Sequence, residues 1–138
     1  MGTRRKAREL SLQVLFQVDV GGLSLDEAFG NFWRVGKSSE EIRDFTLRIC
    51  RGVVENLEAV DAVISKYTRN WGIDRITNVD RNILRVAVYE LLFCPDIPYK
   101  VSINEAIEVA KKYGTADSGK FINGVLDKVA KETGKIKE

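Results

Sequence analysis

The 138-residue sequence contains no histidine. This absence excludes the most common general base and metal ligand in proteins, and with them any Ser-His-Asp triad. Cysteine is also scarce, because Cys50 and Cys94 stand far apart and no second pair could complete a zinc site. Both lie within apolar runs, so we expect them to be buried structural thiols. We therefore expect no enzymatic activity, no metal site and no cofactor.

Long hydrophobic runs are missing as well. No stretch approaches the roughly 20 apolar residues that a membrane-spanning helix needs. The basic start MGTRRKAR leads into Glu9 and Gln13 without the apolar core of a signal peptide. We therefore expect a cytoplasmic protein that does not contact a membrane. With 44% hydrophobic residues the chain is too apolar to be disordered, and its length suits one domain, residues 1–138.

Helical periodicity runs through nearly every segment between the glycines and prolines. In Thr3–Val20, Leu12 and Phe16 lie on the side of the helix opposite Val14. A helix that is apolar on two sides packs between two layers, so we expect this one to be central. No segment shows the alternation of a strand. The sequence thus predicts an all-α fold, with six to seven helices in two small helical bundles packed around the N-terminal helix.

Capping residues mark where several of these helices begin. Three Ser–Glu pairs have the spacing of a capping box: Ser24 with Glu27, Ser38 with Glu41, and Ser102 with Glu105. Thr77 stands three residues before Asp80 and opens a further helix, which Pro95 stops. The apolar pattern from residue 42 to residue 67 is too long for an ordinary globular helix. We therefore expect a break within residues 56–61.

The formal net charge of +2 conceals two basic ends and an acidic middle. The first eight residues hold four cations and no acid: Arg4, Arg5, Lys6 and Arg8. Short arginine-rich helices bind RNA through phosphate contacts. We predict that these four side chains are unpaired, lie outside the apolar stripe and contact RNA. The alternative from the residues alone is an ordinary solvated helix end.

The last helix, which Asp117 or Ser118 opens, separates apolar from basic side chains. At about 100° per residue, its core stripe holds Ile122, Val125, Leu126, Val129 and Ala130. Lys120 and Lys128 lie opposite this stripe, and Phe121 lies beside the lysines. An aromatic ring on a lysine-rich face can stack an unpaired base while the ammonium groups contact phosphates. The periodicity leaves open whether Phe121 does this or belongs to the edge of the core.

Longer segments carry a family likeness. The sequence opens with TRRKARELSLQVLFQ, has ILRVAVYEL in its middle and continues from Pro98 with PYKVSINEAIEVAKKYGTADSGKFINGVLDKVAKE. Together these segments resemble the NusB family of bacterial transcription antitermination factors. The resemblance runs from about Arg4 to Glu132 and is strongest from Pro98 onward. It implies an all-helical fold of two three-helix bundles that share a kinked or additional helix.

The resemblance also implies partners. Members of the family bind single-stranded boxA RNA and pair with NusE, a small-subunit ribosomal protein. The heterodimer joins antitermination complexes on RNA polymerase during transcription of ribosomal RNA. By resemblance, the RNA-binding residues are Arg4, Arg5, Arg8, Asp117, Ser118, Lys120 and Phe121. Asp80, which we expect to be exposed, takes the place of an acid that faces NusE. Gly119 departs from the family, which often has a polar or basic residue there.

Two alternatives remain open. The same kind of helical domain occurs fused ahead of methyltransferases that modify cytosine in ribosomal RNA, so the chain could be an RNA-binding domain of that type. It could instead be a protein-only scaffold whose basic ends keep it in solution. A preference among RNA sequences would distinguish an RNA-binding antitermination factor from such a scaffold.

Overall fold

The computed structural model describes residues 2–35, 39–68 and 72–134, and within these ranges it contains helices and no strand. The seven α-helices are α1 (Thr3–Asp19), α2 (Leu25–Val35), α3 (Glu40–Glu55), α4 (Leu57–Lys66), α5 (Asn78–Phe93), α6 (Tyr99–Tyr113) and α7 (Ser118–Glu132). A 3-10 turn, η1, spans Ile73–Arg75. The all-α prediction is confirmed, and so is the break, which falls at Asn56. Over the described ranges, no helix combines the length and the apolar character needed to cross a membrane.

Two helix starts follow the predicted capping chemistry. The hydroxyl of Ser24 accepts the N–H of Glu27, and the Glu27 carboxylate accepts the N–H of Ser24 in return. Thr77 caps α5 by accepting the N–H of Asp80. These side chains satisfy N–H groups that have no partner within the helix, and so fix where α2 and α5 begin.

Two other predicted starts differ. Ser102 and Glu105 form no capping box, because α6 already begins at Tyr99, directly after Pro98. A proline suits this position because its missing N–H would have no helical partner there. Ser38 lies outside the described residues. The cap of α3 is Ser39, whose hydroxyl accepts the N–H of Ile42.

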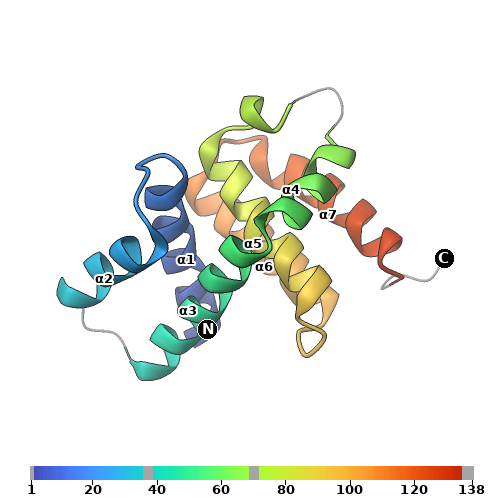
Figure 1. The fold of residues 1–138 in the computed structure, drawn as a ribbon. Coiled ribbons are helices and arrows are strands. Elements are labelled where there is room, and N and C mark those ends of the chain that lie inside the picture. Colours follow the sequence, from blue (N-terminus) through green and yellow to red (C-terminus); the bar gives the residue numbers. More distant parts are fainter. Residues whose placement is uncertain (1, 36–38, 69–71, 135–138) are drawn as a thin grey trace.

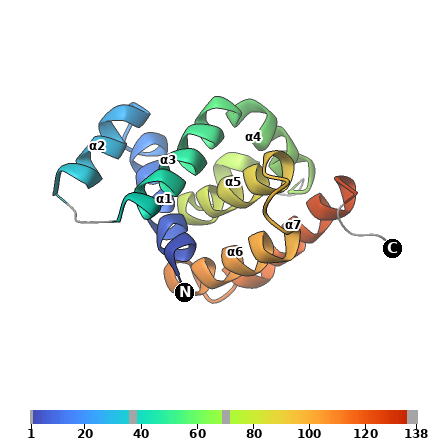
Figure 2. The ribbon, with the colours of Figure 1, turned by 90° about the horizontal axis from the view of Figure 1, so that it is seen from below.

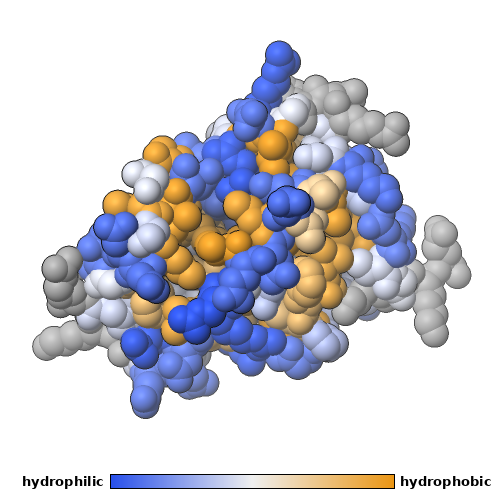
Figure 3. Space-filling view, viewed as in Figure 1, coloured by the Kyte–Doolittle hydropathy of each residue, from blue (hydrophilic) through white to orange (hydrophobic). Residues whose placement is uncertain are grey.

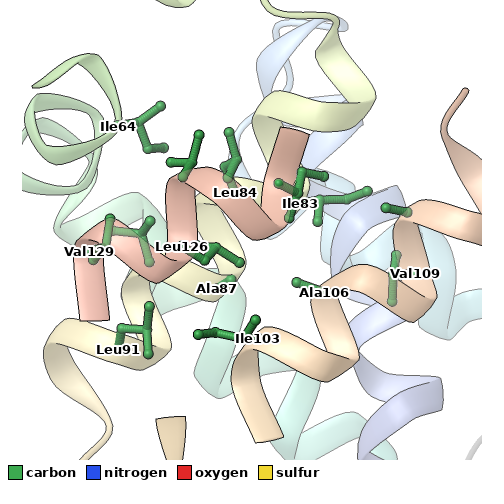
Figure 4. Close-up of a cluster of buried hydrophobic side chains, with 14 of the residues drawn as sticks. Ile64, Ile83, Leu84, Ala87, Leu91, Ile103, Ala106, Val109, Leu126 and Val129 are labelled. Carbon is green, nitrogen blue, oxygen red and sulfur yellow. The ribbon is translucent and has the colours of Figure 1, made fainter. Parts of the chain in front are cut away.

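Two hydrophobic cores lie side by side and share α1 and α5. The first joins α1, α2 and α3 and includes Val14 and Val86. The second joins α4 to α7 and includes Leu12 and Leu84; Figure 4 shows its side chains converging from all four helices. In both Figure 1 and Figure 2, α5 runs through the middle of the molecule. The predicted central place of α1 is confirmed, and α5 shares it.

Both cysteines are buried in or against the first core. Burial raises the pKa of the Cys50 thiol to about 12, so this group stays protonated at neutral pH. The prediction of buried structural thiols is confirmed. Within the described ranges, no group of three histidine, cysteine or acidic side chains could hold a metal ion.

A buried ion pair joins α1, α5 and α6 where the cores meet. Arg8 donates two hydrogen bonds of 2.8 Å to the carboxylate of Glu90, and the two side chains are only 5% and 1% exposed. Ser102 donates a third bond, of 2.7 Å, to the same carboxylate. Burying two charges is costly unless their hydrogen bonds are satisfied. This triple contact therefore holds the three helices in one arrangement.

A second charged cluster holds the other end of α1. Asp19 accepts bonds of 3.0 and 2.7 Å from Arg81 and one of 3.0 Å from Asn82, both in α5. Burial by itself raises the pKa of Asp19, but the bonds from Arg81 and Asn82 outweigh it and keep this pKa below its ordinary value. Arg85 extends the cluster to Asp61 in α4. The start of α5 is thereby fixed against α1.

We expect Glu90→Ala to destabilise the protein by about 3–5 kcal/mol, because it leaves the Arg8 guanidinium buried without its counter-charge. The measurement is the free energy of unfolding by denaturant. Glu108→Ala removes an exposed carboxylate and should change this free energy little. The double variant Arg8→Met with Glu90→Leu removes both charges and should recover most of the loss. An equal effect of Glu90→Ala and Glu108→Ala would contradict the assigned role of the buried pair.

Candidate nucleic-acid interface

The four cations at the start of α1 lie in different environments. Arg4 and Lys6 are exposed, and the Arg4 guanidinium lies 4.5 Å from the centre of the Phe45 ring. Arg8 is buried against Glu90. The prediction that all four are unpaired is therefore wrong. Acids from α5 and α6 pack against this end of α1, and no pattern within the first helix could reveal them.

Arg5 is paired as well, but at the surface. Its Nε and Nη2 atoms donate bonds of 3.0 and 2.6 Å to the two carboxylate oxygens of Glu105. Those bonds hold the pKa of Glu105 below its ordinary value. The Nη1 atom of Arg8 lies 3.8 Å from the same carboxylate. Two acids thus offset two of the four cations, and Arg4 and Lys6 carry the remaining positive charge.

The turn between α6 and α7 sets the positions of the predicted residues in the last helix. Ser118 is buried, and its hydroxyl accepts the N–H of Thr115 at 2.9 Å. Asp117 is exposed at the cap position of α7, where its side chain forms no capping bond. Lys120 and Lys128 are exposed, opposite the buried stripe of α7, as predicted.

A groove of about 300 Å³, here called the α5–α7 groove, lies between the starts of these two helices. Phe121, Ser118 and Asp117 line one side, and Asp80 and Arg75 line the other. The Phe121 ring is half-buried and packs against the second core while it borders this groove. The ring therefore belongs to the edge of the core and also borders the groove, where stacking on a base stays a prediction.

Asp80 is buried, so the prediction that it is exposed is wrong. Asp80 is only 8% exposed. Its Oδ1 atom is buried and has no hydrogen-bond partner among the described residues. The Thr77 cap places Asp80 in the first turn of α5, where the helix N-terminus favours a negative charge. Asp80 also lines the groove, and a carboxylate that lines a groove can accept a bond from a base amino group or a basic side chain that enters it.

The α5–α7 groove unites residues that the sequence assigned to different partners. Phe121 and Asp117 were predicted to contact RNA, and Asp80 to contact a protein. All three border one groove. Arg75 and Thr115 border it too, and no motif singled them out, because they come from turns whose meeting depends on how α5 packs beside α7.

A second groove, of about 470 Å³, lies between α6 and the start of α7. Lys111 and Lys120 give it a basic rim, and Gly119 lies between them. A Cβ atom at Gly119 would meet only Ile107 Cγ2, at 3.7 Å. A glycine at this position therefore relieves no crowding, and without a side chain it leaves the groove open.

Comparisons with known proteins agree on one family. A model described as the NusB family matches residues 5–131. The transcription antitermination protein NusB of Pelotomaculum thermopropionicum is 49% identical over 127 residues, which are 92% of this chain and 88% of that protein. The structure of T. maritima NusB is 36% identical, with a TM-score of 0.82 and 99% of both chains covered.

A crystal structure of the antitermination factors NusB and NusE in complex with dsRNA also contains a similar chain. That chain is 28% identical, has a TM-score of 0.87 and covers 96% of the present chain and 98% of its own length. The likeness therefore extends over nearly the whole helical arrangement.

Two substitutions at Phe121 distinguish its packing against the core from its predicted stacking on a base. Phe121→Ala should cost stability, though less than the roughly 3–5 kcal/mol of a fully buried phenylalanine, and should weaken RNA binding by about 1–3 kcal/mol if one base stacks on the ring. Phe121→Leu keeps the packing against the core but removes the aromatic face. It should stay nearly as stable as the wild type and still bind RNA more weakly. Denaturant unfolding and RNA titration of both variants test this, and wild-type RNA affinity of Phe121→Leu would contradict stacking.

Proposed function

The chain belongs to the NusB family, and on this premise we propose that it is a transcription antitermination factor that binds single-stranded boxA-type RNA together with NusE. In this proposal the heterodimer joins antitermination complexes on RNA polymerase in the cytoplasm and supports transcription of ribosomal RNA. The chain acts as an adaptor and not as an enzyme. The observation that carries the proposal is the α5–α7 groove, where an aromatic ring and two carboxylates lie together.

The groove suits an unpaired base. Phe121 offers a face for stacking, the carboxylates of Asp80 and Asp117 can accept bonds from amino groups, and Arg75 can donate to a carbonyl group. A base in a duplex is stacked and paired, so its face and its Watson–Crick edge are both free only in a single strand. Lys120 is exposed, precedes Phe121 in α7 and lines the second groove, so it can meet a phosphate that flanks such a base.

The proposed protein partner has a surface of its own. Figure 3 shows hydrophobic residues at the surface in patches between hydrophilic ones, on the face seen in Figure 1. An apolar groove of about 380 Å³ is lined by Phe16, Phe32, Val79 and Tyr113, and Phe16 is 41% exposed. Exposed aromatic side chains in a groove are typical anchors for another protein. We propose that NusE binds here.

The two proposed surfaces meet at the start of α5. Val79 lines the apolar groove, and the next residue, Asp80, lines the α5–α7 groove. A partner in the apolar groove can therefore touch both the start of α5 and the bound RNA. If NusE strengthens RNA binding in this way, RNA must strengthen NusE binding by the same factor.

The alternatives have less support. The relative and the structures described above carry the NusB name, and one of these structures holds NusE and dsRNA. These comparisons favour an antitermination factor over the RNA-binding domain of a methyltransferase. A protein-only scaffold offers no reason for two carboxylates and an aromatic ring to line one groove.

Fluorescence titration with four RNAs tests the function. We expect a single-stranded boxA-type RNA to bind more tightly than a scrambled RNA, and more tightly than either sequence in duplex form. Adding NusE should increase the preference for the boxA-type strand. Equal affinity for the boxA-type and scrambled strands, with and without NusE, would contradict the proposal and favour the scaffold.

Phe16→Ala tests the protein surface. Because Phe16 is 41% exposed, we expect little loss of stability, while affinity for NusE should fall by about 2 kcal/mol or more if the ring is an anchor of the interface. RNA binding by the free protein should stay at the wild-type level. Calorimetry with NusE makes the measurement, and Phe93→Ala, which truncates another exposed aromatic side chain, is the control. A wild-type NusE affinity for Phe16→Ala would show that the partner binds elsewhere.

A further inference from the structure

The contact between Arg5 and Glu105 occupies a cation in the basic start of α1. Glu105 takes the Nε and Nη2 donors of Arg5, which form one edge of the guanidinium group. A phosphate also binds best to two parallel N–H groups of one arginine edge. Glu105 and an RNA phosphate therefore compete for the same two donors of Arg5.

Both side chains of the pair are partly exposed, so Arg5 can exchange Glu105 for another partner. The Arg5 side chain is 37% exposed and that of Glu105 is 16% exposed, so solvent and solutes reach the pair. The neighbouring pair differs, since Arg8 and Glu90 are 5% and 1% exposed. A phosphate can thus approach Arg5 but has no path to Arg8.

Glu105 also keeps a counter-charge if Arg5 leaves it. The Nη1 atom of Arg8 lies 3.8 Å from the Glu105 carboxylate. Arg8 remains in place because Glu90 holds it by two other nitrogen atoms. Loss of Arg5 therefore does not leave an isolated charge, which would otherwise make the exchange costly.

We propose that Glu105 is a built-in competitor of RNA, which occupies Arg5 in the free protein and gives it up to a phosphate when RNA binds. This inference rests on the proposed function. Because phosphates carry no sequence information, the competition weakens the binding of every RNA by the same factor. It lowers non-specific binding and leaves the discrimination between sequences to the α5–α7 groove.

The variant Glu105→Gln keeps the shape of the side chain and removes its charge. It should tighten the binding of boxA-type and scrambled RNA alike, by about three- to fivefold at low salt, the order expected for unit charges about 5 Å apart in water. The ratio of the two affinities should not change. The slope of log affinity against log salt should change little, because Arg5 contacts a phosphate in both complexes and the number of phosphate contacts sets this slope.

Two further variants separate this competition from a general change of charge. Glu108→Gln makes the same charge change on the same helix, where the carboxylate contacts Lys111 and not Arg5, and should tighten binding less. In an Arg5→Gln background, Glu105→Gln should add no more than Glu108→Gln does. An equal gain with and without Arg5, or no gain at all, would overturn the proposal. A gain for one RNA sequence only would show that Glu105 contacts a base, and would overturn it too.

A thermal melt shows whether Glu105→Gln folds. If it does not, Glu105→Asp replaces it, because the shorter side chain keeps the charge but draws the carboxylate back from the two donors of Arg5, and a smaller gain in affinity for both RNAs is expected. Different results would contradict the proposed function and the proposed role of Glu105. A wild-type protein with equal affinity for boxA-type and scrambled RNA contradicts the proposed function, whereas an unaltered RNA affinity of the Glu105 variant contradicts only the role of Glu105.

Discussion

Arg8 and Glu90 lie where α1, α5 and α6 meet, and the positions of both cores depend on their contact. A buried charge is tolerated only in an environment that satisfies its hydrogen bonds. Here that environment consists of three side chains from three helices, Arg8, Glu90 and Ser102. A rotation of any one helix would break the set. The pair therefore selects one packing of helices whose apolar faces alone would allow several.

The candidate site follows from this arrangement. With α1 fixed against α6, the start of α1 lies beside Glu105, and half of its formal charge is offset. At the other end of α1, the Asp19 cluster fixes the start of α5. The start of α5 then borders two grooves, one with the aromatic and acidic groups suited to a base and one with the apolar groups suited to a protein. Binding at one groove can thus influence the other without a large change of shape.

Local rules predicted much of the fold correctly. The cap at Thr77, the capping box at Ser24 and the break at Asn56 depend on residues within a few positions of one another. The failure at Ser102 and Glu105 is instructive because their spacing is correct for a capping box. Their side chains instead bond to Glu90 and Arg5, which lie in other helices.

The sequence by itself determined the helices, the two apolar sides of α1, the exposed lysines of α7 and the family. These features depend on periodicity and on order along the chain, which are local. Only the tertiary structure decided that Arg5 and Arg8 are paired, that Asp80 is buried, and that Asp80 and Phe121 share one groove. The physical reason is that a charge's partner and its access to water depend on which helices pack together. Helical periodicity shows which face of a helix is apolar, but not which acid of another helix will lie opposite a given arginine.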